Sequence, residues 1–481
     1  MDQNKHSGIL CHITSLPTDY GIGDFGPCAY KFVDELALAK QTHWQMLPTG
    51  NTNDSGCPYS TDSAFGCADF YVSPELLIKD FNLQETTFRK YYVQTEKVDF
   101  KNAKINKQKI LEVAYQNFNP DKKYYDFLLQ EKTWLTDYCQ FRTLSETRGH
   151  DWREWGSVQL SSVEMARVEF HQFCQYACFS QLARLKQYAN GKNVKLVGDL
   201  PIFVSYQSMD VWKNPRQFFL NEKMEMEYET GAAPDSFSIT GQKWGTPIYN
   251  WDAQKEDNYE WWNQRLSFLK RYFDVIRIDH FRGFCATWIS KILELDASGG
   301  HWFKGPGAEL FNQLRDYPEI IAEDLGFITA DVDQLRDQFN FPGMKVFQFL
   351  LGDSSNPHKL SNYHFNSVAY SGTHDCDTLM GWFHNLSETD RANVECELKM
   401  KNPSYWDMLK VLLHTPAKLV FIQIQDLLGL GTEARFNYPG TVEDTNWTWK
   451  LKKQDLDHID WKKLAELTEK SGRGNVRQAC G

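Results

Sequence analysis

Eight short apolar runs recur along the chain, and helical periodicity fills several of the intervals between them. Runs of this length, rich in β-branched residues, predict buried parallel strands, and eight such strands are the number that closes a β/α barrel. An amphipathic helix is predicted between the first two runs, at Ala29–Lys40. The predicted strands are Gly8–Ile13, His43–Leu47, Val194–Asp199, Val275–Asp279, Glu319–Asp324, Met344–Phe349, Ser367–Thr373 and Lys418–Gln423. We therefore expect an α/β fold, specifically a (β/α)8 TIM barrel.

The predicted strands are unevenly spaced. Roughly 150 residues separate the second from the third, far more than one crossover connection needs. Most of that interval, residues 52–159, has helical periodicity and predicts a helical insertion. A second insertion, residues 205–252, follows the third strand and predicts an ordered loop near the active-site face, because it is rich in Gly, Pro and aromatic residues. We expect one catalytic domain over residues 1–481, with a frayed tail after Lys470.

Acidic residues end four of the predicted strand segments: Asp199, Asp279, Glu323 and Asp375. Arg277 lies two residues before Asp279 and therefore on the same face of its strand. Because chemistry in a β/α barrel gathers where the strands end, we expect the four carboxylates to meet at one mouth. Any one of these acids alone could instead be a helix N-cap or a loop carboxylate. Their clustering with other polar groups favours a functional site, since burying unpaired charge is costly.

Charge and composition narrow the class of ligand. The 481-residue chain has 52 Lys and Arg against 63 Asp and Glu, a formal charge of −11, and it contains no long basic run. This balance disfavours nucleic acid and anionic membrane as partners, so we expect a neutral ligand. The N-terminal sequence lacks the apolar core of a signal peptide, and no run approaches about 18 apolar residues. We therefore expect a cytosolic protein.

The eleven cysteines have no paired spacing, which favours reduced thiols over a disulfide framework. A zinc site would need a C-x-x-C or H-E-x-x-H pattern, and the sequence has neither. We therefore expect no metal and no cofactor. The Cys and His side chains that could otherwise form such a site are Cys11, Cys57, Cys67, Cys376, His12, His43 and His374.

Two carboxylic acids on opposite sides of a glycosidic bond are the minimum for glycoside cleavage. Sugars also need aromatic faces for stacking and polar side chains for their hydroxyl groups. The segment Pro234–Trp251 interleaves both kinds of residue, which indicates a carbohydrate-binding loop. The alternative is a structural loop held by buried aromatic side chains. The residues of interest are Asp235, Gln242, Trp244, Tyr249, Asn250 and Trp251.

A set of longer motifs covers nearly the whole chain in a fixed order. They are HITSLPTDYGIGDFGP (12–27), CPYSTDSAFG (57–66), GDLPIFV (198–204), PDSFSITGQKWGTPIYNW (234–251), RIDHFRG (277–283), AEDLG (322–326), GTHDCDT (372–378), LGLGTEARFNYPGT (428–441) and NWTWKL (446–451). With these motifs the chain resembles the 4-α-glucanotransferases of the amylomaltase, or disproportionating-enzyme, family, a branch of the α-amylase superfamily. A single motif of this kind would be weak evidence for the resemblance, but the full set in this order is specific to the family.

The resemblance implies a catalytic role for three carboxylates. Asp279 is expected to be the nucleophile that forms a covalent glycosyl-enzyme, and Glu323 the general acid and then base. Asp375 is expected to fix sugar hydroxyls and stabilise the transition state. Arg277 is expected to hold Asp279 ionised and oriented.

The same resemblance implies five further binding residues. His374 and Asp199 are expected to bind hydroxyl groups of the donor sugar, and Tyr59 to stack beneath its ring. Gln242 and Trp244 are expected to shape a loop over the acceptor side. The chain departs from the usual family pattern at Cys57, at Cys376 and in the segment 66–70. None of these departures affects the three carboxylates. They bear on the preferred length of the glucan and on details of the subsites rather than on the reaction.

The expected activity is retaining transfer of an α-1,4-glucan segment to the 4-hydroxyl of glucose or another maltooligosaccharide. One alternative is an α-glucan hydrolase with the same carboxylates, which would accumulate reducing ends. The other is a non-catalytic glucan-binding protein, which is disfavoured because Asp279, Glu323 and Asp375 are all present. The sequence does not predict the oligomeric state.

Overall fold

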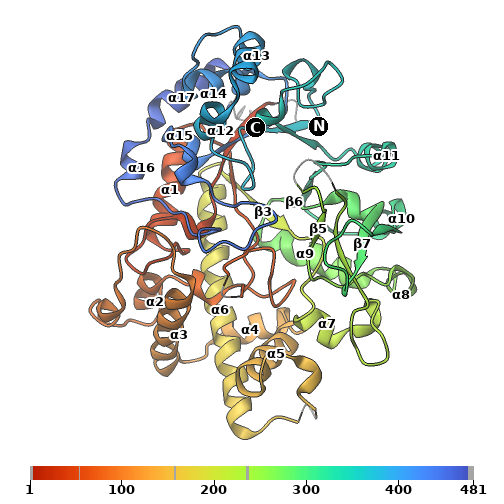
Figure 1. Cartoon of the computed structure of the whole chain (residues 1–481). Helices are drawn as coiled ribbons and strands as arrows, with labels where there is room; N and C mark the ends of the chain where they lie inside the picture. Colours follow the sequence, from red (N-terminus) through yellow and green to blue (C-terminus); the bar gives the residue numbers. More distant parts are fainter. Residues whose placement is uncertain (1–3, 54, 157–158, 235–237, 475–481) are drawn as a thin grey trace, which may run out of the picture.

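The computed structural model describes residues 4–53, 55–156, 159–234 and 238–474 (Figure 1). Eight parallel strands close into a barrel in the order β1-β12-β11-β10-β9-β6-β3-β2, which confirms the predicted (β/α)8 fold. Their bounds are β1 His6–Leu10, β2 His43–Gln45, β3 Lys195–Leu200, β6 Val275–Ile278, β9 Glu319–Ala322, β10 Gly343–Val346, β11 Ser367–Tyr370 and β12 Leu419–Gln423. All eight overlap predicted runs. The first lies earlier than predicted, because Ile13–Ser15 forms a 3-10 turn instead.

Alternation along each strand separates the barrel interior from the side that packs on the helices. In β3, Val197 and Asp199 share a face, as Val275 and Arg277 do in β6. The barrel interior is apolar along most of the strands, and the charged side chains lie at the carboxyl ends of the strands. One separate apolar cluster of strand residues comprises Val197, Val275, Ile321, Met344, Val368, Tyr370, Leu419 and Phe421.

Helices connect and cover the strands (Figure 1). The 30-residue α6 begins with a capping box, in which Ser161 and Glu164 bond to each other's backbone, and it leads directly into β3. The helices outside the two insertions are α1 Pro27–Leu38, α6 Ser162–Gly191, α9 Glu260–Tyr272, α10 Ala308–Gln313, α11 Ala330–Gln338, α12 Leu379–Asn385, α13 Glu388–Leu398, α14 Tyr405–His414, α15 Ile424–Leu427, α16 Asp455–His458 and α17 Trp461–Lys470.

The chain between β2 and α6 contains several helices. These helices are α2 Pro74–Asp80, α3 Phe100–Gln116, α4 Lys122–Gln130 and α5 Leu135–Arg148. In Figure 1 they lie beside the lower half of α6, away from the barrel. Helix α5 packs along α6, which therefore joins this region to β3.

The segment after β3 is more regular than the predicted loop. It contains α7 Met209–Lys213, β4 Tyr228–Ala232, β5 Gln242–Lys243 and the start of α8 Trp251–Glu256. With β7 Ala286–Lys291 and β8 His301–Lys304, β4 and β5 form an antiparallel sheet in the order β5-β4-β7-β8. Asp235 lies outside the described residues.

The predicted fraying after Lys470 is wrong for the first part of the tail. The Arg473 side chain is fully buried, and its guanidinium donates to the carbonyl oxygens of His6, Leu413 and Thr415. Three charge-assisted bonds explain why this segment is ordered despite its lack of apolar periodicity. Residues after Gly474 lie outside the described part of the chain. Among the helices that the structure describes, none has the length and apolar character that crossing a membrane requires.

Candidate active site

Arg277 links two carboxylates at the barrel mouth. Its Nη1 lies 2.9 Å from Oδ1 of Asp279 and 2.9 Å from each carboxylate oxygen of Asp199. The pairing of β3 with β6 sets Asp199 directly opposite Arg277. The Tyr59 hydroxyl donates to Oδ2 of Asp199 at 2.9 Å. The Asp199 side chain is fully buried by these partners, so it positions Arg277 and Tyr59.

Glu323 is held beside Asp279 by the backbone. The residue after Asp279, His280, has φ 53° and ψ 50°, a left-handed conformation that is uncommon for a residue other than glycine. In this conformation its N–H donates to Oε2 of Glu323 at 2.6 Å. The Leu325 N–H donates to Oε1 at 2.8 Å. Both carboxylate oxygens are therefore oriented, and the strained residue is the one that connects the two acids.

The protonation states of the two acids differ because their neighbours differ. Burial and, after it, the negative charge of Asp279 raise the pKa of Glu323 to about 8, against the opposing effects of Arg277 and the two backbone N–H groups. Burial also raises the pKa of Asp279, but Arg277 in direct contact opposes it. Glu323 is therefore the acid that favours the protonated form at neutral pH, whereas contact with Arg277 favours the ionised form of Asp279.

Asp375 faces the cavity after β11, and its side chain is 41% exposed. Asn437 donates from Nδ2 to Oδ1 of Asp375 at 2.6 Å, and His374 Nε2 lies 3.4 Å from Oδ2. Arg435 donates to the Asp375 carbonyl oxygen at 2.7 Å. Sequence reasoning assigned no role to Asn437. The motif LGLGTEARFNYPGT contains it, but no spacing rule distinguishes it there.

Tyr59 packs against His374 on one side. The two rings stack with centroids 5.1 Å apart and an interplanar angle of 23°. Trp447 lies against both rings, at 6.1 Å from Tyr59 and 5.9 Å from His374. All three rings line the same cavity. Trp447, in the motif NWTWKL, is a second site residue to which sequence reasoning gave no role.

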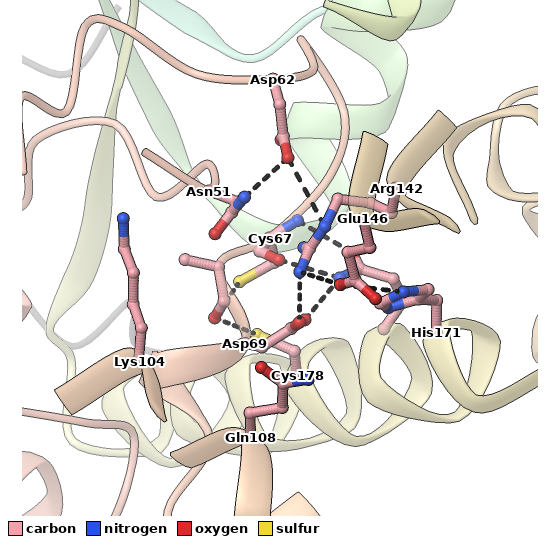
Figure 2. A network of polar contacts seen from close by, with 12 residues as sticks. Asn51, Asp62, Cys67, Asp69, Lys104, Gln108, Arg142, Glu146, His171 and Cys178 are labelled. Carbon is pink, nitrogen blue, oxygen red and sulfur yellow. Dashed lines mark hydrogen bonds and ion pairs between the residues drawn. The ribbon is translucent and has the colours of Figure 1, made fainter. Parts of the chain in front are cut away.

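A polar network anchors the loop that carries Tyr59 (Figure 2). Arg142 of α5 lies between two acids of this loop, with Nη2 3.1 Å from Asp69 and Nε 3.7 Å from Asp62. Asp62 also accepts hydrogen bonds from Asn51 at 2.6 Å and from Tyr138 at 3.1 Å. The loop is therefore tied to the helices between β2 and β3.

Trp244 and Gln242 lie beside His280, on the same side of the site as Glu323. The Trp244 indole meets the His280 ring edge-on with centroids 4.8 Å apart, and its N–H donates to Oε1 of Gln242 at 3.1 Å. Burial lowers the pKa of His280 to about 3, so its ring is neutral. Its buried Nε2 has no hydrogen-bond partner in the part of the chain that the structure describes, which leaves it available to a ligand hydroxyl group.

One cavity of about 380 Å³ collects most of the predicted site residues. Asp199, behind Arg277, is the exception and does not line it. The eight predicted residues that do are Tyr59, Gln242, Trp244, Arg277, Asp279, Glu323, His374 and Asp375.

Cys57 and Cys376, two of the departures from the family pattern, also line the cavity. Burial raises the pKa of each thiol to about 11, so both are neutral at neutral pH. Within the described ranges, no three His, Cys, Asp or Glu side chains are placed to hold a metal ion.

A family model described as 4-alpha-glucanotransferase matches residues 11–456, a span that includes every predicted site residue. The chain belongs to the 4-alpha-glucanotransferase family. Among family members, the 4-alpha-glucanotransferase of Clostridium butyricum is 38% identical over 96% of this chain and 99% of its own length. That of Aquifex aeolicus is 38% identical over 93% of this chain and 95% of its own length.

Solved amylomaltase structures agree with the fold. The amylomaltase from Streptococcus agalactiae, solved in complex with acarbose, has a TM-score of 0.91 and 35% identity, and the match covers 98% of this chain and 100% of that one. The amylomaltase from Corynebacterium glutamicum, at 17% identity and a TM-score of 0.80 over 96% of this chain and 75% of that one, supports the fold alone.

Proposed function

We propose that the protein is a 4-α-glucanotransferase, which cleaves an α-1,4-glucan and transfers the released segment to the 4-hydroxyl of glucose or another maltooligosaccharide. The observation that carries this proposal is the pairing in one cavity of Asp279, in contact with Arg277, with Glu323, whose pKa is raised to about 8. One nucleophile and one acid are what retaining glycoside chemistry needs.

In the first step, Glu323 gives its proton to the glycosidic oxygen while Asp279 attacks C1. The C1–O bond breaks, the shortened glucan leaves, and a glycosyl ester forms on Asp279. Esterification removes the negative charge that raises the pKa of Glu323, so this pKa falls. Glu323 can then accept the proton of an acceptor 4-hydroxyl as that oxygen attacks C1. The ester bond from C1 to Asp279 breaks in the same step, which releases the product and restores the Asp279 carboxylate and the Glu323 acid.

The other side chains divide between the two sides of the reacting bond. Asp375, with His374 and Asn437 beside it, suits the hydroxyl groups of the donor sugar. On the opposite side, Trp244 and the neutral His280 lie next to Glu323 and suit the acceptor. Arg277 stabilises the charge of Asp279, and Asp199 positions Arg277 rather than contacting the sugar.

Transfer rather than hydrolysis requires that an acceptor sugar compete with water at about 55 M for the glycosyl-enzyme. The aromatic cover that Trp244 and His280 form beside Glu323 supports this. The carboxylates that line the cavity support catalysis over simple glucan binding. A cytosolic location stays a prediction from the sequence.

The experiment that tests the proposal is chromatography of the products from pure maltotriose, with reducing ends counted in parallel. A transferase yields glucose and longer maltooligosaccharides while the number of reducing ends stays constant. Asp279→Asn, which keeps the volume and removes the nucleophile, is the matched inactive control. Reducing ends that rise in step with turnover would identify a hydrolase, and binding without turnover would identify a non-catalytic protein.

A further inference from the structure

Two exposed aromatic side chains line the rim of the catalytic cavity and have no role in the steps above. Trp302 is 36% exposed and Phe327 is 59% exposed. Their rings are nearly parallel, with centroids 6.2 Å apart and an interplanar angle of 19°. We call this pair the rim platform. Large apolar side chains exposed together beside a cavity indicate a binding surface.

The rim platform is held in place from behind. Arg282, which is 5% exposed, has its guanidinium carbon 3.8 Å from the Trp302 ring centroid and 5.7 Å from that of Phe327. The same guanidinium donates to the Phe327 carbonyl oxygen. Trp288, opposite Trp302 in the pairing of β7 with β8, meets it edge-on at 5.1 Å. A ligand that stacks on the platform therefore meets rings whose orientation is already set.

The chemistry of the site places the rim platform on the acceptor side. The leaving group departs from the side of its proton donor, Glu323, and the acceptor enters where the leaving group was. Phe327 lies four residues after Glu323 in the same loop. Arg282 lies two residues after His280, whose N–H donates to Glu323. The donor-side groups Asp375 and Asn437 come from the loops after β11 and β12 instead.

The exposure of the platform places it beyond the first acceptor position. Trp244 and His280 are half-buried next to Glu323, whereas Phe327 is well exposed. A single glucose at the first position would contact Trp244 and His280. Only a longer acceptor extends outward to the rim.

We propose that Trp302 and Phe327 stack on the second or a later glucosyl unit of the acceptor and thereby select maltooligosaccharides over glucose. The inference rests on the proposed transferase function. It names a determinant of acceptor length at the same site. Stacking of a sugar face on a pre-oriented ring pair contributes to the binding of long acceptors alone.

The test separates acceptor use from donor use. The donor is an α-maltosyl fluoride whose terminal 4-hydroxyl is blocked, so that it cannot act as an acceptor and its fluoride leaves without occupying the acceptor side. Glucose and maltotriose are compared as acceptors by kcat/KM. Phe327→Ala should lower kcat/KM for maltotriose about tenfold and leave that for glucose within about twofold. Trp302→Leu should act in the same direction.

Two controls accompany these variants. Phe327→Tyr keeps an aromatic face and should retain the preference for maltotriose. Phe365→Ala removes an equally apolar ring that is 42% exposed but does not line the cavity, and it should change neither value.

An equal loss of kcat/KM for glucose and maltotriose, or no loss for maltotriose, would overturn the proposed role of the rim platform. Either result would leave the proposed transferase function standing. A wild-type protein that only hydrolyses the fluoride, whatever acceptor is added, would overturn the proposed function and this inference together.

Discussion

Asp279 and Glu323 have the same functional group, and their neighbours assign them different roles. Arg277 contacts Asp279, whereas both oxygens of Glu323 accept only backbone hydrogen bonds. The acid without a cationic partner keeps its proton. The proposed roles therefore depend on two contacts that can be tested separately.

Glu323→Gln should cripple transfer from maltooligosaccharides, because the amide cannot protonate a glycosidic oxygen. It should spare the first step on an α-glycosyl fluoride, whose leaving group needs no proton. A glycosyl-enzyme on Asp279 should then accumulate, and mass spectrometry of the digested protein measures it. A label on any other residue would contradict both assignments.

The pH dependence should follow the Glu323 proton. The acid form is needed for the first step, so kcat/KM for maltotriose should be highest below the pKa of about 8 and fall as pH rises through it. Activity measured from about pH 5 to about pH 10 checks this. With a glycosyl fluoride donor the alkaline fall in the first step should disappear. The same fall with both donors would assign it to another group.

The sequence could predict where Asp199, Asp279 and Glu323 lie, because each is at or directly after the end of a buried strand, whereas Asp375 lies five residues after β11. It could not predict Asn437 or Trp447, because both lie in a loop whose contacts come from tertiary structure. Asp199 shows the opposite limit. Its position at the strand end was predicted, but its burial behind Arg277 depends on the Tyr59 hydroxyl, 140 residues away in the sequence.

The sheet β5-β4-β7-β8 covers the acceptor side and was not predicted. Its strands come from two segments on either side of β6, and β5 has two residues, too few to show a period of two. The pairing of strands from distant segments cannot be predicted from the local sequence pattern. The barrel strands could be predicted from it, because each is a buried apolar run.

Trp244, just after β5, provides the test of what this sheet does. Trp244→Ala removes the ring that covers His280 and opens the acceptor side to water. We expect transfer to fall about tenfold, for a stacking loss of about 1 kcal/mol or more, while hydrolysis falls less. The measurement is the ratio of new glycosidic bonds to reducing ends released. An unchanged ratio would mean that the loop is only structural.

The helices between β2 and β3 contribute to the site through the Arg142 network, although none of them lines the catalytic cavity. Arg142→Leu leaves Asp62 and Asp69 without this cation, and losing hydrogen bonds to a charged group costs about 1.5 kcal/mol or more. We expect a lower unfolding free energy in urea and a reduced kcat, because the loop that carries Tyr59 loses its anchor.

Arg184→Leu is the matched control for Arg142→Leu. It removes a more exposed pair, in which Arg184 of α6 contacts Asp80 of α2, and such pairs contribute less than about 1 kcal/mol. Equal stability and activity of the two variants would show that the Arg142 network does not support the site.

The two sides of the cavity rest on different parts of the protein. The donor side stands on loops that leave strands of the closed barrel, where a change disturbs the chemistry. The acceptor side also includes residues of the peripheral sheet, Gln242 of β5 and Trp302 of β8. Substitutions in that sheet can alter the choice of acceptor while Asp279 and Glu323 stay in place. Evolution, or a designer, could thus diversify the products of this enzyme without reinventing its reaction.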